Sequence, residues 1–186
     1  MTDRKTNKKI KRTHLVVFSI CLVLITVIGV TYFLQSEQRE SALAYYERQQ
    51  ISLNIENPKT GSNHFVVSKS DLMLLEIHKI NATRRTSAGE VSELVYEGVL
   101  LRDLLAAYHV DQGDFEQVII FAVDGYQSIV AAERLYEQDH VYLVFIEDGL
   151  PLQDRGQMGD GPYLLVILED TFSQNWCKYV VEVTVQ

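Results

Sequence analysis

The stretch VIIFAVDGYQSIV, from Val118 to Val130, decides the fold class of this chain. It places two runs of β-forming residues on either side of Asp124-Gly125, a residue pair that forms tight hairpin turns. The stretch VYLVFIEDGLPL, from Val141 to Leu152, repeats this arrangement around Asp148-Gly149. Two hairpins so close together in the chain predict a sheet in which most strands pair antiparallel.

The residues around the two hairpins predict further short strands and short helices. Ile51, Leu53 and Ile55 alternate with polar residues as in a strand, and leucines at helical spacing in YEGVLLRDLLAAYHV, residues 96–110, predict an amphipathic helix. Further strands are expected at 64–67, 77–80, 163–168 and 178–185, a helical turn capped at Ser70-Asp71, and a helical link at 131–139. The sum is an α+β fold with mixed, mainly antiparallel sheets and short helices.

The composition of the 186 residues suits one globular domain and one unusually apolar segment. With 47% hydrophobic and 10% aromatic residues the chain can build a core of ordinary size, and three prolines exclude a low-complexity or collagen-like chain. The first 14 residues contain six Lys or Arg and one Asp, which leaves 11 basic and 24 acidic residues in the rest. An outer part near −13 repels nucleic acid, so nucleic acid is not an expected partner.

The segment from Leu15 to Leu34 is free of charge over twenty positions. At 1.5 Å per residue this length matches a hydrocarbon core of about 30 Å, and it exceeds the apolar region of a cleavable signal peptide. A buried core helix is the other alternative. The basic flank before the segment predicts a cytoplasmic amino terminus and an extracytoplasmic remainder, with residues 15–34 contacting membrane lipid.

These patterns divide the chain into four parts, and its two cysteines suggest the kind of cell. The parts are a basic cytoplasmic tail (1–14), a transmembrane helix (15–34), a helical stalk (35–50) and an extracytoplasmic domain (51–186). Cys21 lies in the predicted span and Cys177 near the end of the chain, so no intrachain disulfide is expected. An outer domain without disulfides favours a single-pass protein of a bacterial cell membrane.

Four stretches in order resemble the molybdopterin-binding domain of the sulfite oxidase family. They are Tyr96–Leu105 (aromatic-x-Gly-Val), Ala122–Tyr126 (Asp-Gly-Tyr), Glu147–Leu152 (family Asn-Gly-x-Pro-Leu) and Lys178–Val180 (family Lys-Trp-Val). The match covers about Leu94 to Val185 and extends weakly back to Ile51. The resemblance implies a domain of that fold, with molybdopterin as the family cofactor.

The resemblance also implies two functional residues that this chain lacks. The family's molybdenum-binding cysteine would lie around Ile80–Arg85, which reads INATRR, and no cysteine occurs between Leu22 and Trp176. The family's arginine after the loop Gly-Pro is also missing, because Gly161-Pro162 is followed by Tyr163. Cys177 is expected to be a small, half-buried residue and not a replacement ligand. We therefore expect no bound molybdenum, while the identity of any cofactor stays open.

Four residues are the candidates for binding a cofactor or an anionic small molecule. Arg84 and Arg85 offer paired, charge-assisted hydrogen bonds, with a solvated loop as the alternative. Asp124 and Tyr126 come from the Asp-Gly-Tyr motif, where the turn itself also favours Asp. The histidines lack metal-ligand spacing and are expected to be surface or satisfied residues, so no metal ligand or catalytic residue is assigned.

Two functions are consistent with these residues. The first is a membrane-anchored, non-catalytic binding or accessory module, whose partner is an anionic small molecule or another membrane or cell-surface protein. The alternative is a molybdopterin-dependent oxidoreductase with an oxygen or nitrogen ligand in place of the sulfur. Because fold and function are separable and the ligating residue is absent, the first is favoured.

Overall fold

The structure is a computed structural model that describes residues 22–31, 33, 50–57, 61–86, 88–168, 170 and 173–186. The chain divides into two compact units, Met1–Ala44 and Tyr45–Gln186. In the first unit Leu22–Thr31 and Phe33 are helical. No helix within the described ranges has the length and apolarity needed to cross a membrane. The predicted tail (1–14), the predicted stalk apart from Gln50, and residues 15–21, 32 and 34 of the predicted span lie outside those ranges.

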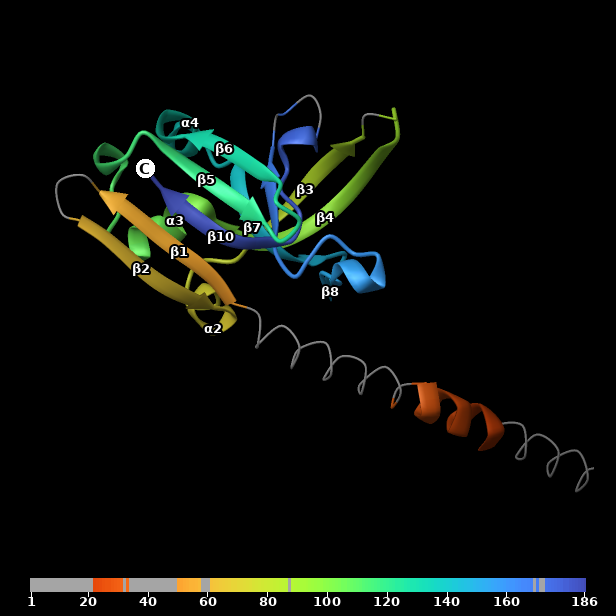
Figure 1. The fold of residues 1–186 in the computed structure, drawn as a ribbon. Coiled ribbons are helices and arrows are strands. Elements are labelled where there is room, and N and C mark those ends of the chain that lie inside the picture. The colour runs from red at the N-terminus through yellow and green to blue at the C-terminus, as the bar shows by residue number, and fades with distance from the viewer. Residues whose placement is uncertain are drawn as a thin grey trace, which may run out of the picture. The chain divides into compact units, whose positions relative to one another are not determined.

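The described part of the second unit consists mainly of short strands and short helices (Figure 1). The strands are β1 (Gln50–Asn57), β2 (Gly61–Ser68), β3 (His78–Arg85), β4 (Val91–Leu100), β5 (Gln117–Ala122), β6 (Gln127–Ala131), β7 (Val141–Glu147), β8 (Leu150–Pro151), β9 (Leu164–Ile167) and β10 (Val180–Val185). The helices are α2 (Lys69–Leu72), α3 (Leu101–Ala107) and α4 (Ala132–Glu137), with 3₁₀ turns at Gln112–Asp114, Arg155–Gln157 and Ser173–Asn175.

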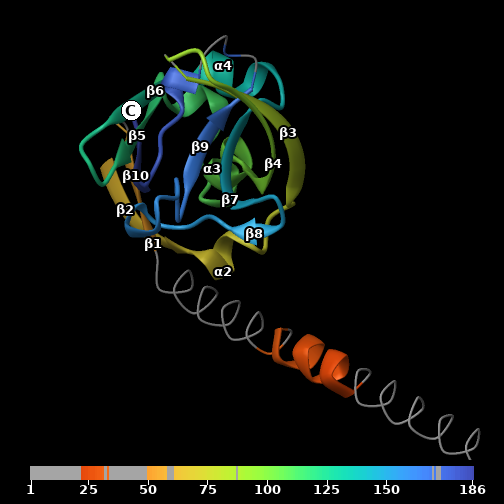
Figure 2. The same cartoon turned by 90° about the vertical axis from the view of Figure 1, so that its right-hand side faces the viewer.

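Two five-stranded sheets enclose the core, as the α+β prediction requires. The first has the order β2-β1-β10-β5-β6, and the second has the order β3-β4-β7-β8, with β9 also paired to β7. Every strand pair is antiparallel except β1 with β10. In Figure 2, β3, β4, β7 and β9 follow one another around a curve, so the two outer strands of this sheet, β3 and β9, turn toward each other.

The stretch YEGVLL begins as a strand and not as the predicted helix. Tyr96 to Leu100 belong to β4, and α3 starts only at Leu101. Gly98 explains the difference, because a Cβ atom there would lie 2.3 Å from the carbonyl oxygen of Leu143 in β7. The missing side chain lets β4 pack directly onto β7, and the burial of Tyr96 and Val99 anchors the strand. Leucine spacing alone could not show this close approach of two backbones.

Both predicted hairpins and the link between them are confirmed. β5 and β6 join at Asp124-Gly125, β7 and β8 join at Asp148-Gly149, and α4 is the helical link. The predicted cap of the first short helix is wrong by two residues. Ser68 is the N-cap of α2, because its Oγ accepts from Asp71 N and the Asp71 carboxylate accepts in return from Ser68 N, at 2.8 Å.

Candidate functional site

Two clefts open on either side of the end of β3. The first, about 800 Å³, lies between the end of β3, the β7–β8 turn and the loop Gln153–Asp160. The second, about 490 Å³, lies between Asn81–Thr83 on β3 and the segment that runs from the end of β9 to Trp176. Arg85 lines both clefts. The last residues of β3 therefore form the wall that separates two candidate sites.

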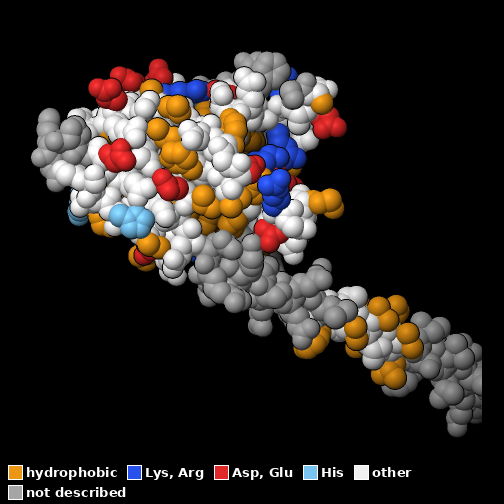
Figure 3. All heavy atoms as spheres, viewed as in Figure 1, with side chains coloured by type: hydrophobic (Ala, Val, Ile, Leu, Met, Phe, Trp, Pro, Cys, Tyr) orange, Lys and Arg blue, Asp and Glu red, His pale blue; other side chains and the backbone are white. Residues whose placement is uncertain are grey.

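The first cleft is built on the carboxylate of Asp160, which is 8% exposed. Arg84 Nη1 lies 2.6 Å from Asp160 Oδ2, and Lys178 Nζ lies 2.7 Å from Asp160 Oδ1. Figure 3 shows Lys and Arg side chains gathered on the side of the domain where β8 lies, with acidic side chains beside them. Because one carboxylate engages both cations, neither Arg84 nor Lys178 is a free anion-binding group.

The loop that carries Asp160 is held tightly by backbone contacts. Gly159 N donates to Asp154 O at 2.9 Å, and Gly161 N donates to Gln153 O at 2.8 Å. A Cβ atom on Gly159 would lie 2.1 Å from Gln153 O, so only glycine fits this turn. The loop therefore fixes Asp160 between two cations that come from distant parts of the chain.

Glu147 and Tyr96 add a half-buried acid and a buried hydroxyl beside the first cleft. Burial raises the pKa of Glu147, while the nearby Arg84 opposes this rise. Burial also raises the pKa of Tyr96, with the Glu147 carboxylate adding to the effect. The Tyr96 hydroxyl has no hydrogen bond of normal geometry. The wall of the cleft thus combines charges of both signs.

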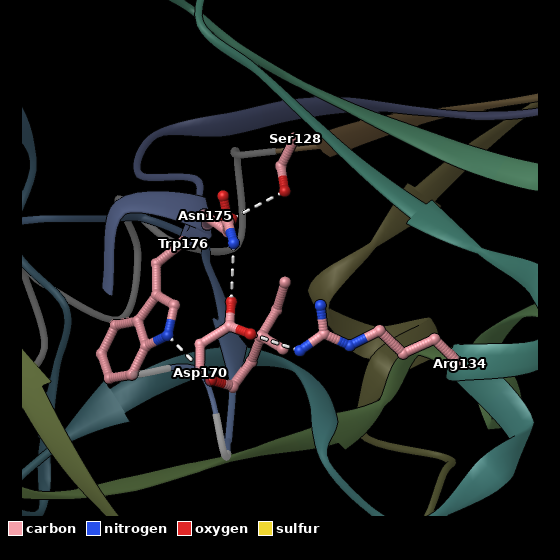
Figure 4. A network of polar contacts seen from close by, with 6 residues as sticks. Ser128, Arg134, Asp170, Asn175 and Trp176 are labelled. Atoms are coloured by element: carbon pink, nitrogen blue, oxygen red, sulfur yellow. Dashed lines mark hydrogen bonds and ion pairs between the residues drawn. The ribbon is translucent and has the colours of Figure 1, made fainter. Parts of the chain in front are cut away.

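The second cleft is lined by a buried alanine from the stretch Ile80–Arg85, where the resemblance implied a cysteine. Ala82 is 2% exposed and lines the cleft, together with Trp176 and Asp170. Figure 4 shows how this side is fixed: Arg134 of α4 forms an ion pair with Asp170, and Asn175 Nδ2 donates to Asp170 Oδ2 at 3.0 Å. Both oxygens of Asp170 are therefore engaged within the protein.

Neighbouring hydrogen bonds hold the residues from Ser173 to Trp176. Trp176 Nε1 donates to Ile167 O at 2.9 Å, and Ser128 Oγ of β6 donates to Asn175 O at 2.7 Å (Figure 4). Ser173 Oγ donates to the carbonyl oxygen of Arg85 at 2.7 Å. The segment thus connects the first sheet, the end of β9 and the end of β3.

Cys177 is fully buried, and more so than the half-buried position expected. Its Sγ lies 3.7 Å from Ile120 O and 3.8 Å from Lys178 O. Burial raises the pKa of the thiol to about 12, and the Asp124 carboxylate contributes to this rise. Cys177 is not among the residues that line either cleft. A thiol in these surroundings stays protonated near neutral pH.

The four predicted binding residues fall into two groups. Arg84 and Arg85 lie together at the clefts, where Arg84 is paired and Arg85 has no ion pair with any described residue. Asp124 and Tyr126 lie at the β5–β6 turn, outside the lining of both clefts. Asp124 Oδ1 accepts from Tyr126 N at 3.1 Å, and Tyr126 Oη donates to Gln174 O at 2.5 Å. Through Tyr126 they contact Gln174, which lines the first cleft.

Two histidines differ from the expectation that each histidine lies at the surface or has hydrogen-bond partners for its ring nitrogens. His140 is 5% exposed with no hydrogen-bond partner at Nδ1, and Nε2 of His78 is also buried without one. The His78 ring packs against Tyr142, with ring centroids 5.8 Å apart. Within the described residues, no three His, Cys, Asp or Glu side chains are grouped as metal ligands would be.

Asp160, Lys178, Asp170 and Trp176 are the site residues that the sequence did not reveal. Each lies in a loop or beside an irregular turn, and the arginine partners of Asp160 and Asp170 are 76 and 36 positions away in the chain. One feature of the sequence pointed toward Asp160. Three glycines in the loop Gln153–Pro162 indicate a tightly folded backbone, and loops of this kind often carry functional side chains.

The comparisons relate this chain to known proteins through its fold. No known protein family matches the sequence, and no curated protein matches it. The structure is similar to the crystal structure of the sulfane dehydrogenase SoxCD from Paracoccus pantotrophus, with a TM-score of 0.62 and 17% identity over 75% of this chain. The chain spans 38% of the length of that neighbour. The similarity is a distant relationship in fold.

Proposed function

We propose that this protein is a membrane-tethered, extracytoplasmic accessory module that binds a small anionic molecule on a scaffold of the molybdopterin-domain type. Two lines of argument support the scaffold. One is the order of the four sequence motifs, and the other is the fold shared with a sulfane dehydrogenase. By name, the sulfite oxidase family and the sulfane dehydrogenase both act on sulfur compounds. This chain keeps the architecture and, in our proposal, has exchanged the redox chemistry for binding.

The observation that carries the proposal is the buried methyl group of Ala82. It lies within Ile80–Arg85, where the family's cysteine is expected, and it lines the second cleft. A molybdenum centre of this type needs a soft sulfur ligand together with the residues that support it. The residues present do not fit such a centre, because Ala82 has no donor atom and Cys177 lies outside the cleft.

The alternative, an oxidoreductase with an oxygen ligand, finds little support in the same cleft. The Thr83 hydroxyl donates to Glu93 Oε1 at 2.8 Å. Asp170 is held by Arg134 and Asn175. An oxygen that must first leave an ion pair or a hydrogen bond is a poor ligand for a high-valent metal. We therefore derive no reaction step for this chain.

Arg85 is the residue proposed to bind the ligand. It is exposed and has no ion pair with described residues, whereas Arg84 and Lys178 already neutralise Asp160. The Ser173 hydroxyl holds the Arg85 carbonyl, so the residue projects from a fixed backbone. A phosphate or carboxylate at Arg85 would gain charge-assisted hydrogen bonds from a cation that forms no ion pair with the described residues.

The membrane tether is proposed from the sequence. Residues 15–34 contain no charge, and six basic residues precede them. This pattern places the amino terminus in the cytoplasm and the acidic domain outside. A tethered domain without a redox centre is suited to hold a ligand or a partner protein at the outer face of the membrane.

The deciding experiment measures molybdenum and ligand binding in the same preparation. Residues 35–186, produced where molybdopterin is supplied, are expected to contain little molybdenum by elemental analysis. They are also expected to bind a phosphate-bearing pterin, with affinity reduced about tenfold by Arg85→Ala through loss of a charge-assisted contact. Near-stoichiometric molybdenum together with oxidation of a small sulfur compound would overturn the proposal and support the alternative.

Two control variants separate binding from folding. Arg155→Ala removes a cation whose guanidinium lies 5.9 Å from the Tyr179 ring and which does not line the first cleft, so binding should be unchanged. Arg84→Ala removes the partner of Asp160, so it should lower stability more than Arg85→Ala does. If Arg155→Ala weakens binding as much as Arg85→Ala, the contact with the ligand is nonspecific attraction and not a site at Arg85.

A further inference from the structure

The turn after α2 exposes apolar side chains that the domain itself does not cover. Met73 is 55% exposed, Leu74 85% and Ile77 36%, while the neighbouring Leu72 is fully buried. Leu74 has one of the largest exposed fractions among the hydrophobic side chains of the described residues. Three exposed apolar side chains within five positions form a small patch, which we name the α2 turn.

The exposure of the α2 turn is imposed by local structure. Asp71 and Ser68 form a capping box that begins α2, and hydrogen bonding to Ser68 lowers the pKa of Asp71. Leu74 N donates to Asp71 O at 3.2 Å, and Leu75 N donates to Leu72 O at 3.1 Å. These bonds point Leu72 into the core and leave Leu74 directed outward. The turn therefore cannot cover Leu74 without breaking the capped helix.

The α2 turn lies at the end of the domain where the chain enters it. Gln50, the first residue of β1, is paired with Ser68, the last residue of β2, and α2 follows Ser68 directly. Figure 1 shows α2 beside the beginning of β1, and β6 on the other side of β1. Whatever holds the chain just before Gln50 is therefore close to the α2 turn.

We propose that the α2 turn rests on the lipid surface of the membrane in which residues 15–34 are anchored. This inference depends on the membrane tether of the proposed function. The link 35–49 spans at most about 23 Å as a helix, and a domain of this size is roughly 35 Å across. The tether thus keeps the entry end of the domain nearest to the bilayer, which is where the apolar turn lies.

Tethering makes a small apolar patch sufficient for contact with lipid. Met73, Leu74 and Ile77 bury little area, so the free domain binds vesicles weakly. An anchor in the same chain converts this contact into an intramolecular event at high effective concentration. The carboxylate of Glu76 in the turn and the acidic domain disfavour anionic headgroups, so zwitterionic phosphatidylcholine is the surface that fits.

The test uses the full chain in phosphatidylcholine vesicles with a fluorophore at one of two positions. Cys21→Ser leaves only the buried Cys177, and Leu74→Cys or Ile129→Cys then provides the labelled thiol. Ile129 on β6 is 60% exposed and serves as the matched control. We expect iodide to quench the label at position 74 about threefold more slowly than at 129, because the bilayer shields it. A quencher carried by the lipid should act on position 74 alone.

Flotation of the same vesicles separates the two proposals. Protein that fails to float lacks the anchor, which overturns the membrane tether and this inference with it. Protein that floats while both labels meet iodide equally overturns the contact of the α2 turn with lipid and leaves the tether intact. A label at 74 that is protected from iodide but not quenched from the lipid shows that protein covers the turn, which also overturns the lipid contact.

Discussion

The two clefts are each built on one buried carboxylate, and the difference between these carboxylates explains how the clefts differ. Asp160 binds two cations, Arg84 from β3 and Lys178 from just before β10. Asp170 binds one cation, Arg134 of α4, and an amide only five residues away. Both clefts therefore join distant elements through an ion pair, but two cations share Asp160 in the first cleft, whereas one cation and a nearby amide share Asp170 in the second.

Two of the cations beside the first cleft, Arg84 and Lys178, mainly stabilise the fold. The sequence suggested Arg84 and Arg85 as an anion site, but in the structure Arg84 shares the Asp160 carboxylate with Lys178. Only Arg85 remains for a ligand among the described cations of that cleft. Ligand binding and fold stability should thus be separable by substitution.

The largest expected effect is that of Asp160→Ala. The substitution leaves the partly buried Arg84 and the more exposed Lys178 without their carboxylate, so the free energy of unfolding should fall by about 3 kcal/mol. Urea denaturation of residues 35–186 measures the change. Asp154→Ala is the matched control in the same loop, because it removes a capping contact with Gln157 N at 3.0 Å, and it should cost about 1 kcal/mol. If both variants lose the same free energy of unfolding, the ion pairs of Asp160 with Arg84 and Lys178 do not stabilise the domain.

A smaller effect is expected from Asp170→Ala. One half-exposed cation and one amide lose their partner, so the free energy of unfolding should fall by about 1.5 kcal/mol. Trp176 is the one tryptophan of the chain and lines the second cleft, so its fluorescence reports on this segment. The emission maximum should move to longer wavelength as water enters. An unchanged spectrum would show that the hydrogen bond from Trp176 to Ile167 O holds the indole in place without Asp170.

The next effect is a pH dependence that differs between two carboxyl groups. Burial raises the pKa of Glu147 above 4.5, so its contribution to stability is present at low pH and is lost as pH rises through the folded pKa. Hydrogen bonding to Ser68 lowers the pKa of Asp71 below 3.8, so its contribution is present at higher pH and is lost as pH falls through that lowered value. Above pH 4.5, Glu147→Gln should therefore flatten the pH profile of stability, and Asp71→Asn should not.

Much of the fold could be predicted from the sequence, because hairpins are specified locally. Asp-Gly pairs between β-forming runs located two turns correctly, and the alternation at Ile51 located β1. The start of α3 could not be found in this way. It depends on Gly98 and the backbone of β7, which lie more than forty positions apart in the chain.

The candidate site was predictable only in part, for the same physical reason. Arg84 and Arg85 are adjacent in the sequence, so their joint position at the clefts could be expected. The partner of Arg84 is 76 positions away, and nothing near Asp160 identifies it as a buried residue. Asp124 and Tyr126 were selected by a motif, but their position outside both clefts follows from the arrangement of β5 and β6.

The smallest expected effect is an absence of reaction at Cys177, which lies between Trp176 of the second cleft and Lys178 of the first. Burial raises the pKa of this thiol from 9.0 to about 12. A shift of that size lowers the thiolate fraction at neutral pH by roughly a thousandfold. In a Cys21→Ser background, a thiol reagent at pH 8 should therefore label Cys177 only after urea unfolds the domain. Rapid labelling of the folded protein would mean that the segment between the clefts opens, and the two clefts would then have to be treated as one site.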